Sequence, residues 1–352
     1  GAPLTVTLQD LAAFLQNPVK AFFRRRLQVS FAEPDSADLD NEPFGSSGLE
    51  RWDWMDQVLR ACHRELELEP ATPAGDGHGP GAMTPLQSQQ MVARQLGRLQ
   101  RAGQLPTAAP GRFTQAKLAE VLAPMVQAWQ ELRARHPVPR AKLPLRLTHP
   151  DNATLGLDDW LVALHASSPD ADPIWMELRP GKLTAAADKR TLMPRVDALL
   201  GAWLRCLAGS ACGCPAEGVL VGQGALLRVR PPPPDTARQQ LLDLMQAAHA
   251  GLTGDEPLPT AVRTGLAWLQ EPATARSAYQ GGNGPEAPPG EGREPCLARL
   301  FPDFDALASH PGFADASRRL YGPYAEWLST QVTVQALATE SAGDGDPGAQ
   351  DD

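Results

Sequence analysis

The sequence is poor in cysteine, in tyrosine and in long apolar runs, and each shortage excludes a class of protein. Five cysteines among 352 residues are an odd number, which does not fit a disulfide framework and indicates a reducing compartment. With three tyrosines, the core must depend on Leu, Val, Ala and Trp. No stretch approaches the roughly 18 to 20 apolar residues of a membrane helix, and no signal peptide is visible. We therefore expect a cytoplasmic protein without membrane association.

The sequence also lacks a basic excess. Its 32 Lys and Arg against 41 Asp and Glu give a formal net charge of −9, which argues against a free-standing nucleic-acid binder, because neutralising phosphates requires clustered cations. The charge is uneven, however: residues 31–69 are predominantly acidic, 86–146 strongly basic, and the last dozen acidic and polar. Local fields matter more than the total, and we expect the isolated chain to bind DNA weakly.

Proline and glycine, with 35 and 31 residues, concentrate in a few stretches. This pattern predicts one folded domain over residues 3–340, with flexible insertions at 70–85 and 279–295 and a disordered acidic tail at 341–352. Within the domain we expect a mainly helical part (3–146), an α/β core (147–235) and a C-terminal helical part (236–340).

Helical signals dominate the N-terminal part. Thr7 and Asp10 have the spacing of a capping box, and Asn17-Pro18 separates the helix that follows from a second, basic one. Apolar periodicity predicts further helices over 48–69, 86–102, 114–135 and 236–252, with helical structure continuing to about residue 338.

The middle of the chain has strand-like patterns. Residues 143–166 contain two such runs around an Asp-Asn turn, 173–180 contain a third, and 218–231 resemble a hairpin closed by Gly-Gln-Gly. A mostly apolar helix is expected over 192–209. The order predicts an α/β core with helical additions.

This order, a hairpin followed by a strand bearing Glu-x-Arg and then a helix, matches the core of PD-(D/E)XK nucleases. Their chemistry needs an acid on one strand and acid-x-Lys on the next; the strand period of two puts that acid and Lys on one face. Two carboxylates then hold Mg²⁺, which activates water. Glu177 and Arg179 have the acid-x-base spacing, with Asp158 and Asp159 upstream. A purely structural role for these acids stays open, and Arg179 departs from Lys because guanidinium does not exchange a proton at neutral pH.

Motifs running almost end to end resemble the RecC C-terminal domain of bacterial exodeoxyribonuclease V. They are, in order, LQDLAAFLQNPVKAFFRRRLQVSF, NEPFGSSGLERWDW, LQRAGQLPTAAPGRF, WLVALHA, LRPGKL, AWLRCLAG and RVRPPPP. Each motif is of moderate specificity, and their order over some 320 residues carries the resemblance. It implies a PD-(D/E)XK-like fold, a small mixed sheet flanked by helices, with large helical additions, from the end of a longer chain.

The resemblance also implies a degenerate active site. Laying the Gly-x-Ile-Asp motif of related nucleases on residues 159–162 places Val162, which does not bind metal, at the position of the first acid. Making Asp159 that acid requires a shift that turns the strand face over. We therefore expect no catalytic residue and no metal or cofactor in this domain, with Asp159, Val162, Glu177 and Arg179 as degenerate positions. An active Mg²⁺ nuclease using Asp159, Glu177 and a displaced Lys182 is the alternative.

A metal centre elsewhere has little support. Related nucleases of the AddB kind carry an iron–sulfur cluster, with one cysteine just before the proline of the first motif, where this chain has Asn17. Cys206, Cys212 and Cys214 cluster loosely, but such clusters need four well-placed ligands. We expect ordinary cysteines.

By resemblance, the domain is expected to be a scaffold that guides DNA in a RecBCD-type helicase–nuclease, which unwinds and degrades DNA at double-strand ends for recombinational repair. RecB-like and RecD-like partners would supply ATP hydrolysis and cleavage, using ATP and Mg²⁺. Two basic groups are candidates for phosphate contacts, although solvated helix faces explain them equally well, and a pure protein-interaction domain without DNA contact stays open. The candidates are Lys20, Arg24, Arg25, Arg26, Arg133, Arg135, Arg140 and Lys142.

Overall fold

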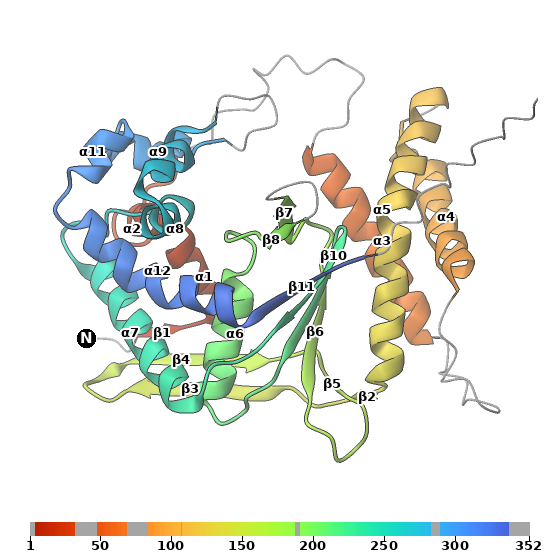
Figure 1. Cartoon of the computed structure of the whole chain (residues 1–352), viewed down its shortest axis with the longest axis horizontal. Coiled ribbons are helices and arrows are strands. Elements are labelled where there is room, and N and C mark those ends of the chain that lie inside the picture. The colour runs from red at the N-terminus through yellow and green to blue at the C-terminus, as the bar shows by residue number, and fades with distance from the viewer. Residues whose placement is uncertain are drawn as a thin grey trace, which may run out of the picture.

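The computed structural model describes residues 4–31, 48–68, 84–106, 108–186, 191–282 and 289–337. Most of the predicted insertion at 70–85 and all of the predicted tail at 341–352 lie outside these ranges. The described part is a mixed α/β structure, with strands at the centre and helices on both sides (Figure 1). The predicted α/β class is confirmed at this level.

The N-terminal segment has the two predicted helices. Strand β1 (Leu4–Val6) leads into α1 (Leu8–Gln16), and α2 (Pro18–Arg25) follows at once. The predicted capping box is present, since the Thr7 hydroxyl accepts the Asp10 N–H at 3.1 Å and the Asp10 carboxylate accepts the Thr7 N–H at 2.9 Å. Asn17 caps α2 by accepting the Lys20 N–H at 2.9 Å.

Three helices form a layer on one side of the molecule (Figure 1). They are α3 (Gly48–Leu68), α4 (Pro85–Arg101) and α5 (Ala108–Arg135). Their buried side chains, with Met55, Met91 and Leu122 among them, form one cluster with Met176 and Val219 from the central sheet. The layer is therefore fixed to the sheet by a shared apolar core.

The predicted strand pair around the Asp-Asn turn forms the smaller sheet. Strand β3 (Leu143–His149) is antiparallel to β4 (Asn152–Leu161), and β1 adds in parallel on the other side of β4. Leu145, Leu155 and Leu157 alternate into the core, as the strand period requires.

The larger sheet has the order β11-β10-β9-β6-β5-β2. Strands β6 and β9 are parallel and the chain between them forms α6 (Leu200–Ala211), whereas the other neighbours are antiparallel. Gly218 is required where β9 passes Trp175, because a Cβ there would overlap the indole ring. The strands are β2 (Val138–Pro139), β5 (Leu164–Ala166), β6 (Ile174–Leu178), β9 (Gly218–Gly222), β10 (Ala225–Val229) and β11 (Val332–Ala336).

The chain passes from the smaller sheet to the larger one within two residues. Val162 and Ala163 separate β4 from β5, and Ala163 has a φ of 58°, in the left-handed region that non-glycine residues rarely adopt. Its carbonyl accepts the Met176 N–H at 3.0 Å, which fixes the bend against β6. The second of the two runs predicted within 143–166 therefore divides into two strands of different sheets.

The second face of the larger sheet packs against α1, α6, α7 (Pro234–Thr253) and α12 (Phe313–Thr330). Trp203 and Leu207 of α6 meet Leu220 and Leu227 of the sheet in this cluster. Two short antiparallel strands, β7 (Thr184–Ala186) and β8 (Leu192–Pro194), lie nearby, with β8 against β11.

The C-terminal helices form a third cluster with α2, around Val19, Tyr279 and Phe313. Glu291 caps the start of α8 by accepting the N–H groups of Arg263 at 3.0 Å and Thr264 at 2.7 Å. The elements are α8 (Val262–Gln270), α9 (Pro272–Gln280), the 3₁₀ helix η2 (Glu291–Arg293), α10 (Pro295–Leu300) and α11 (Phe304–Ala308).

Helix α12 bonds to carbonyl groups that lie far away along the chain. The Tyr321 hydroxyl donates to Leu15 at 2.8 Å, the Tyr324 hydroxyl to Val196 at 2.6 Å, and the Trp327 indole N–H to Arg230 at 2.8 Å. One helix thus joins the N-terminal, central and C-terminal parts.

Two predictions of secondary structure are wrong. The helix expected over 192–209 begins only at Leu200, after β8, because Pro194 favours extended backbone before it. The helical structure expected up to residue 338 ends at Thr330, and β11 follows, a Val-Thr-Val run that suits a strand. In the predicted insertion at 279–295, Gly290 and Gly292 lie against Tyr279 of the third cluster, while 283–288 lie outside the described residues.

Candidate functional site

Glu177 lies near the end of the central strand β6, on the side that faces α6. Trp175 belongs to the α6-side cluster and Met176 to the opposite one, so the strand period puts Glu177 on the side of Trp175. Arg179, two residues on, shares this face and bonds to the Glu177 carboxylate. The acid-x-base spacing read from the sequence therefore brings the two charges together.

Two arginines occupy both oxygens of the Glu177 carboxylate. Arg179 donates from Nε to Oε1 at 2.7 Å and from Nη2 to Oε2 at 3.0 Å, a bidentate pair. Arg205, from α6, donates to Oε2 at 2.6 Å, and its guanidinium lies 5.4 Å from the Trp175 ring centroid. Arg179 also donates to the Ala198 carbonyl at 2.6 Å, which fixes the turn before α6.

The electrostatics of this group favour a permanently ionised Glu177. Burial acts to raise the pKa of the carboxyl, but the hydrogen bonds and charges of Arg179 and Arg205 outweigh it, and the pKa is lowered. A carboxylate with a low pKa and both oxygens paired is a poor proton acceptor. The arrangement is that of a structural ion pair.

The upstream acids have other partners. Asp159 accepts the Leu8 N–H at 2.8 Å and the Trp160 N–H at 2.7 Å, so it ties the start of α1 to the smaller sheet. Asp158 lies opposite Arg146 on β3 and contacts it at 3.4 Å on the surface. Asp159 and Glu177 belong to strands of different sheets, because the chain changes sheet at Ala163.

Val162, the residue at the expected position of the first acid, is 45% exposed just before the Ala163 bend. Lys182, the displaced lysine of the active alternative, is exposed on the segment after β6. The nearest cations to the Glu177 carboxylate are thus two arginines, and arginine does not exchange a proton at neutral pH.

These residues do not fit a Mg²⁺ site. The ion needs free carboxylate or carbonyl oxygens, whereas the oxygens of Glu177 are taken by guanidinium groups and those of Asp159 by backbone N–H groups. Across the described ranges, no three His, Cys, Asp or Glu side chains group in a way that would hold a metal ion. Cys206 is buried in the core, while Cys212 and Cys214 are half-buried.

Of the basic residues on and just after α2, one forms an ion pair with another element and three are exposed. Lys20 lies 3.7 Å from Glu294 at the start of α10, so it is not available as an isolated charge. Arg24, Arg25 and Arg26 are exposed. Part of the acidic stretch at 31–69 that would balance them, residues 32–47 and 69, lies outside the described residues.

The second predicted basic run divides into separate roles. Arg133 has its Nη1 buried, Arg135 lies 3.5 Å from Glu131, and Arg140 donates to the carbonyls of Ser168, Pro169 and Ala171. Lys142 stands 4.0 Å over the Trp160 ring. Arg135 and Arg140 thus have partners within the protein, and Arg140 holds the loop at 168–171.

Three features escaped the sequence-based prediction. Arg205 is the one charged residue of the apolar helix α6, and such a charge indicates a buried partner. Trp52 and Trp160 are 46% and 40% exposed, whereas Trp54 and Trp203 are buried. Arg60, Arg64 and Arg98 line a groove between α3 and α4, which sequence separation conceals.

The sequence profile described as the RecC C-terminal domain matches residues 3–273. The chain belongs to this family. A stretch of 67 residues is 43% identical to the RecBCD enzyme subunit RecC of Escherichia coli (strain K12), which is 19% of this chain and 6% of that protein. The matched stretch therefore spans a small part of that RecC subunit. No helix among the described residues of this RecC-type domain is long and apolar enough to cross a membrane.

Proposed function

We propose that this domain is a non-catalytic scaffold and DNA-guiding part of a RecBCD-type helicase–nuclease. Family membership and the name of the RecC relative support such an assembly. RecB-like and RecD-like subunits would be its partners, with ATP hydrolysis and phosphodiester cleavage carried by them. The domain would serve DNA unwinding and degradation at double-strand ends during repair, in the cytoplasm.

The observation that carries the non-catalytic part is the double arginine pairing of Glu177. A two-carboxylate nuclease site needs acids that are free to bind metal. Here each acid supports the fold instead: Glu177 joins β6 to α6, and Asp159 joins β4 to α1.

A PD-(D/E)XK-like ancestry is proposed on topology. The β3–β4 hairpin is followed by β6, the crossover helix α6 and the parallel strand β9, which is the element order of that nuclease core. Fold likeness alone does not carry activity. Such an ancestry would account for an acid-x-base pair on β6 without a metal.

Cleavage of end-labelled single-stranded and duplex DNA by the purified chain, with Mg²⁺ or Mn²⁺, tests the non-catalytic proposal. We expect no cleavage above that of a heat-denatured sample. Cleavage that disappears in both Glu177→Gln and Asp159→Asn would establish the alternative, an active nuclease.

Co-expression with the RecB-like and RecD-like proteins of the same organism tests the scaffold. We expect the three to co-purify and the complex to degrade linear duplex with ATP and Mg²⁺. A complex that forms while the chain shows no DNA contact by cross-linking would favour the pure interaction domain.

A further inference from the structure

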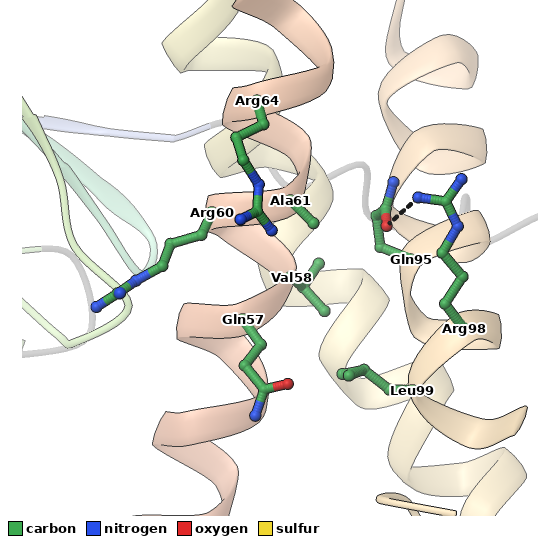
Figure 2. A pocket seen from close by; sticks show the side chains of 8 residues that line it. All are labelled: Gln57, Val58, Arg60, Ala61, Arg64, Gln95, Arg98 and Leu99. Carbon is green, nitrogen blue, oxygen red and sulfur yellow. Dashed lines mark hydrogen bonds between the residues drawn. The ribbon is translucent and has the colours of Figure 1, made fainter. Parts of the chain in front are cut away.

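A basic groove runs between α3 and α4, on the helical layer and away from Glu177. It has a volume of about 340 Å³. Figure 2 shows Arg64 on α3 facing Arg98 on α4 across it, while Arg60 is turned away from the groove. The lining is Gln57, Val58, Arg60, Ala61, Arg64, Gln95, Arg98 and Leu99. It contains three arginines and no acidic side chain.

The positive charge of the groove is only partly compensated. Arg60 is paired with Asp56 at 2.8 Å. Arg64 is exposed and, within the part of the chain that the structure describes, has no ion pair. Arg98 bonds only to a neutral group, donating to the Gln95 amide oxygen at 3.0 Å. Two guanidinium groups therefore face the groove without a carboxylate.

Arg98 is held in place by a buried glutamine and its partners. Gln95 is 4% exposed, and its amide nitrogen donates to Glu65 at 2.7 Å while its oxygen receives Arg98. Glu65 in turn is paired with Arg94. Because the network fixes one guanidinium before any ligand arrives, less side-chain entropy is lost on binding.

We propose that the α3–α4 groove binds the phosphodiester backbone of a single DNA strand, with Arg64 and Arg98 as the contacting cations. Guanidinium groups donate to phosphate oxygens in a bidentate geometry. The volume admits a phosphate and its sugar but not a duplex. The inference rests on the proposed DNA-guiding function and moves the contact away from the residues that the sequence pointed to.

The lining favours DNA over an acidic protein segment. Protein interfaces have an apolar centre with aromatic anchors, whereas the apolar side chains here are limited to Val58, Ala61 and Leu99. Phosphate contacts need only positioned cations. An acidic peptide is accordingly the competing occupant in the test.

The test is fluorescence anisotropy of a labelled 20-nucleotide oligo-dT with the full chain, from about 20 to 200 mM salt. We expect Arg64→Gln/Arg98→Gln to bind roughly tenfold more weakly at low salt. Its log–log salt slope should be smaller by about 1.4, because each lost single-strand contact removes about 0.7. The matched control is Arg238→Gln/Arg318→Gln, which removes the same charge from exposed positions on α7 and α12.

The outcomes separate this inference from the proposed function. If the groove variant and the wild type bind oligo-dT equally, the groove is not the DNA-binding site, but the proposed DNA-guiding function still stands. No binding by the wild type even at 20 mM salt overturns both. A poly-glutamate peptide that binds more tightly than oligo-dT and depends on the same two arginines assigns the groove to an acidic protein segment. Arg64→Gln alone, which breaks no bond in the structure, keeps the test valid if the double variant misfolds.

Discussion

The arginines around Glu177 and those of the α3–α4 groove show two opposite uses of the same side chain. Arg179 and Arg205 are partly buried, and their hydrogen bonds go to the Glu177 carboxylate and, from Arg179, to the Ala198 carbonyl. Arg64 and Arg98 are exposed and face a groove without an acid. The first pair holds the fold together, and the second is free for a ligand. Charge alone does not mark a functional residue; its partners do.

The largest effect is expected where a buried pair loses one member. Glu177→Ala leaves Arg179 and Arg205 facing each other without their carboxylate, so we expect the free energy of unfolding to fall by about 2 to 3 kcal/mol. Urea denaturation followed by circular dichroism measures it. Asp158→Ala, at the exposed contact with Arg146, is the matched control and should cost less than about 1 kcal/mol. Equal losses in both variants would mean that the Glu177 pairs contribute no more to stability than an exposed ion pair.

The pH dependence should show whether Glu177 stabilises the fold through its charge. The pKa of Glu177 is lowered in the folded chain, so the ionised form stabilises the fold above the pKa of the unfolded chain. This contribution is lost as the pH falls through the folded pKa. Urea midpoints of the wild type and Glu177→Gln, compared from pH 7 to pH 3, should therefore converge at acid pH. A constant difference would mean that Glu177 acts through shape and not through charge.

A smaller effect is expected at Asp159. Asp159→Ala removes the acceptor of the Leu8 N–H at the start of α1, which should cost about 1 kcal/mol. Asp159→Asn keeps an acceptor oxygen and should recover most of the stability in the same urea titration. If Asp159→Ala lost DNA cleavage and kept its stability, Asp159 would be a catalytic residue and not a structural one.

The smallest effect on stability is expected in the groove. Arg64→Gln should change the free energy of unfolding by less than about 0.5 kcal/mol, as at other exposed sites. Its effect should appear in the salt dependence of oligo-dT binding instead. Thermal melting beside anisotropy checks both, and a marked drop in melting temperature would place Arg64 with the structural arginines.

The sequence predicted secondary-structure elements better than it predicted contacts between residues that lie far apart in the chain. The Thr7 capping box, the Asp-Asn hairpin and the 218–231 hairpin are local patterns, and the structure confirms them. The pairing of Glu177 with Arg179 follows from the strand period. Its second partner, Arg205, lies on a different element 28 residues away, and a local sequence pattern does not predict a contact over such a separation.

The missed elements have a common cause. β1 and β11 are short strands whose pairing partners lie far along the chain, β4 for one and β10 for the other. Ala163 departs from the strand pattern because tertiary contacts, and not its side chain, impose the bend. The groove was hidden for the same reason, since Arg64 and Arg98 meet only when α3 packs on α4.

The bonds made by α12 have a kinetic consequence. Tyr321 donates to a carbonyl 306 residues earlier in the chain, so this contact forms only after nearly all of the domain has emerged from the ribosome. Contacts of such high sequence separation slow folding, because the intervening chain must be ordered first. Until α12 docks, the apolar sides of α1, α6 and α7 that it covers stay open to solvent. The nascent domain is therefore most prone to aggregation during that interval.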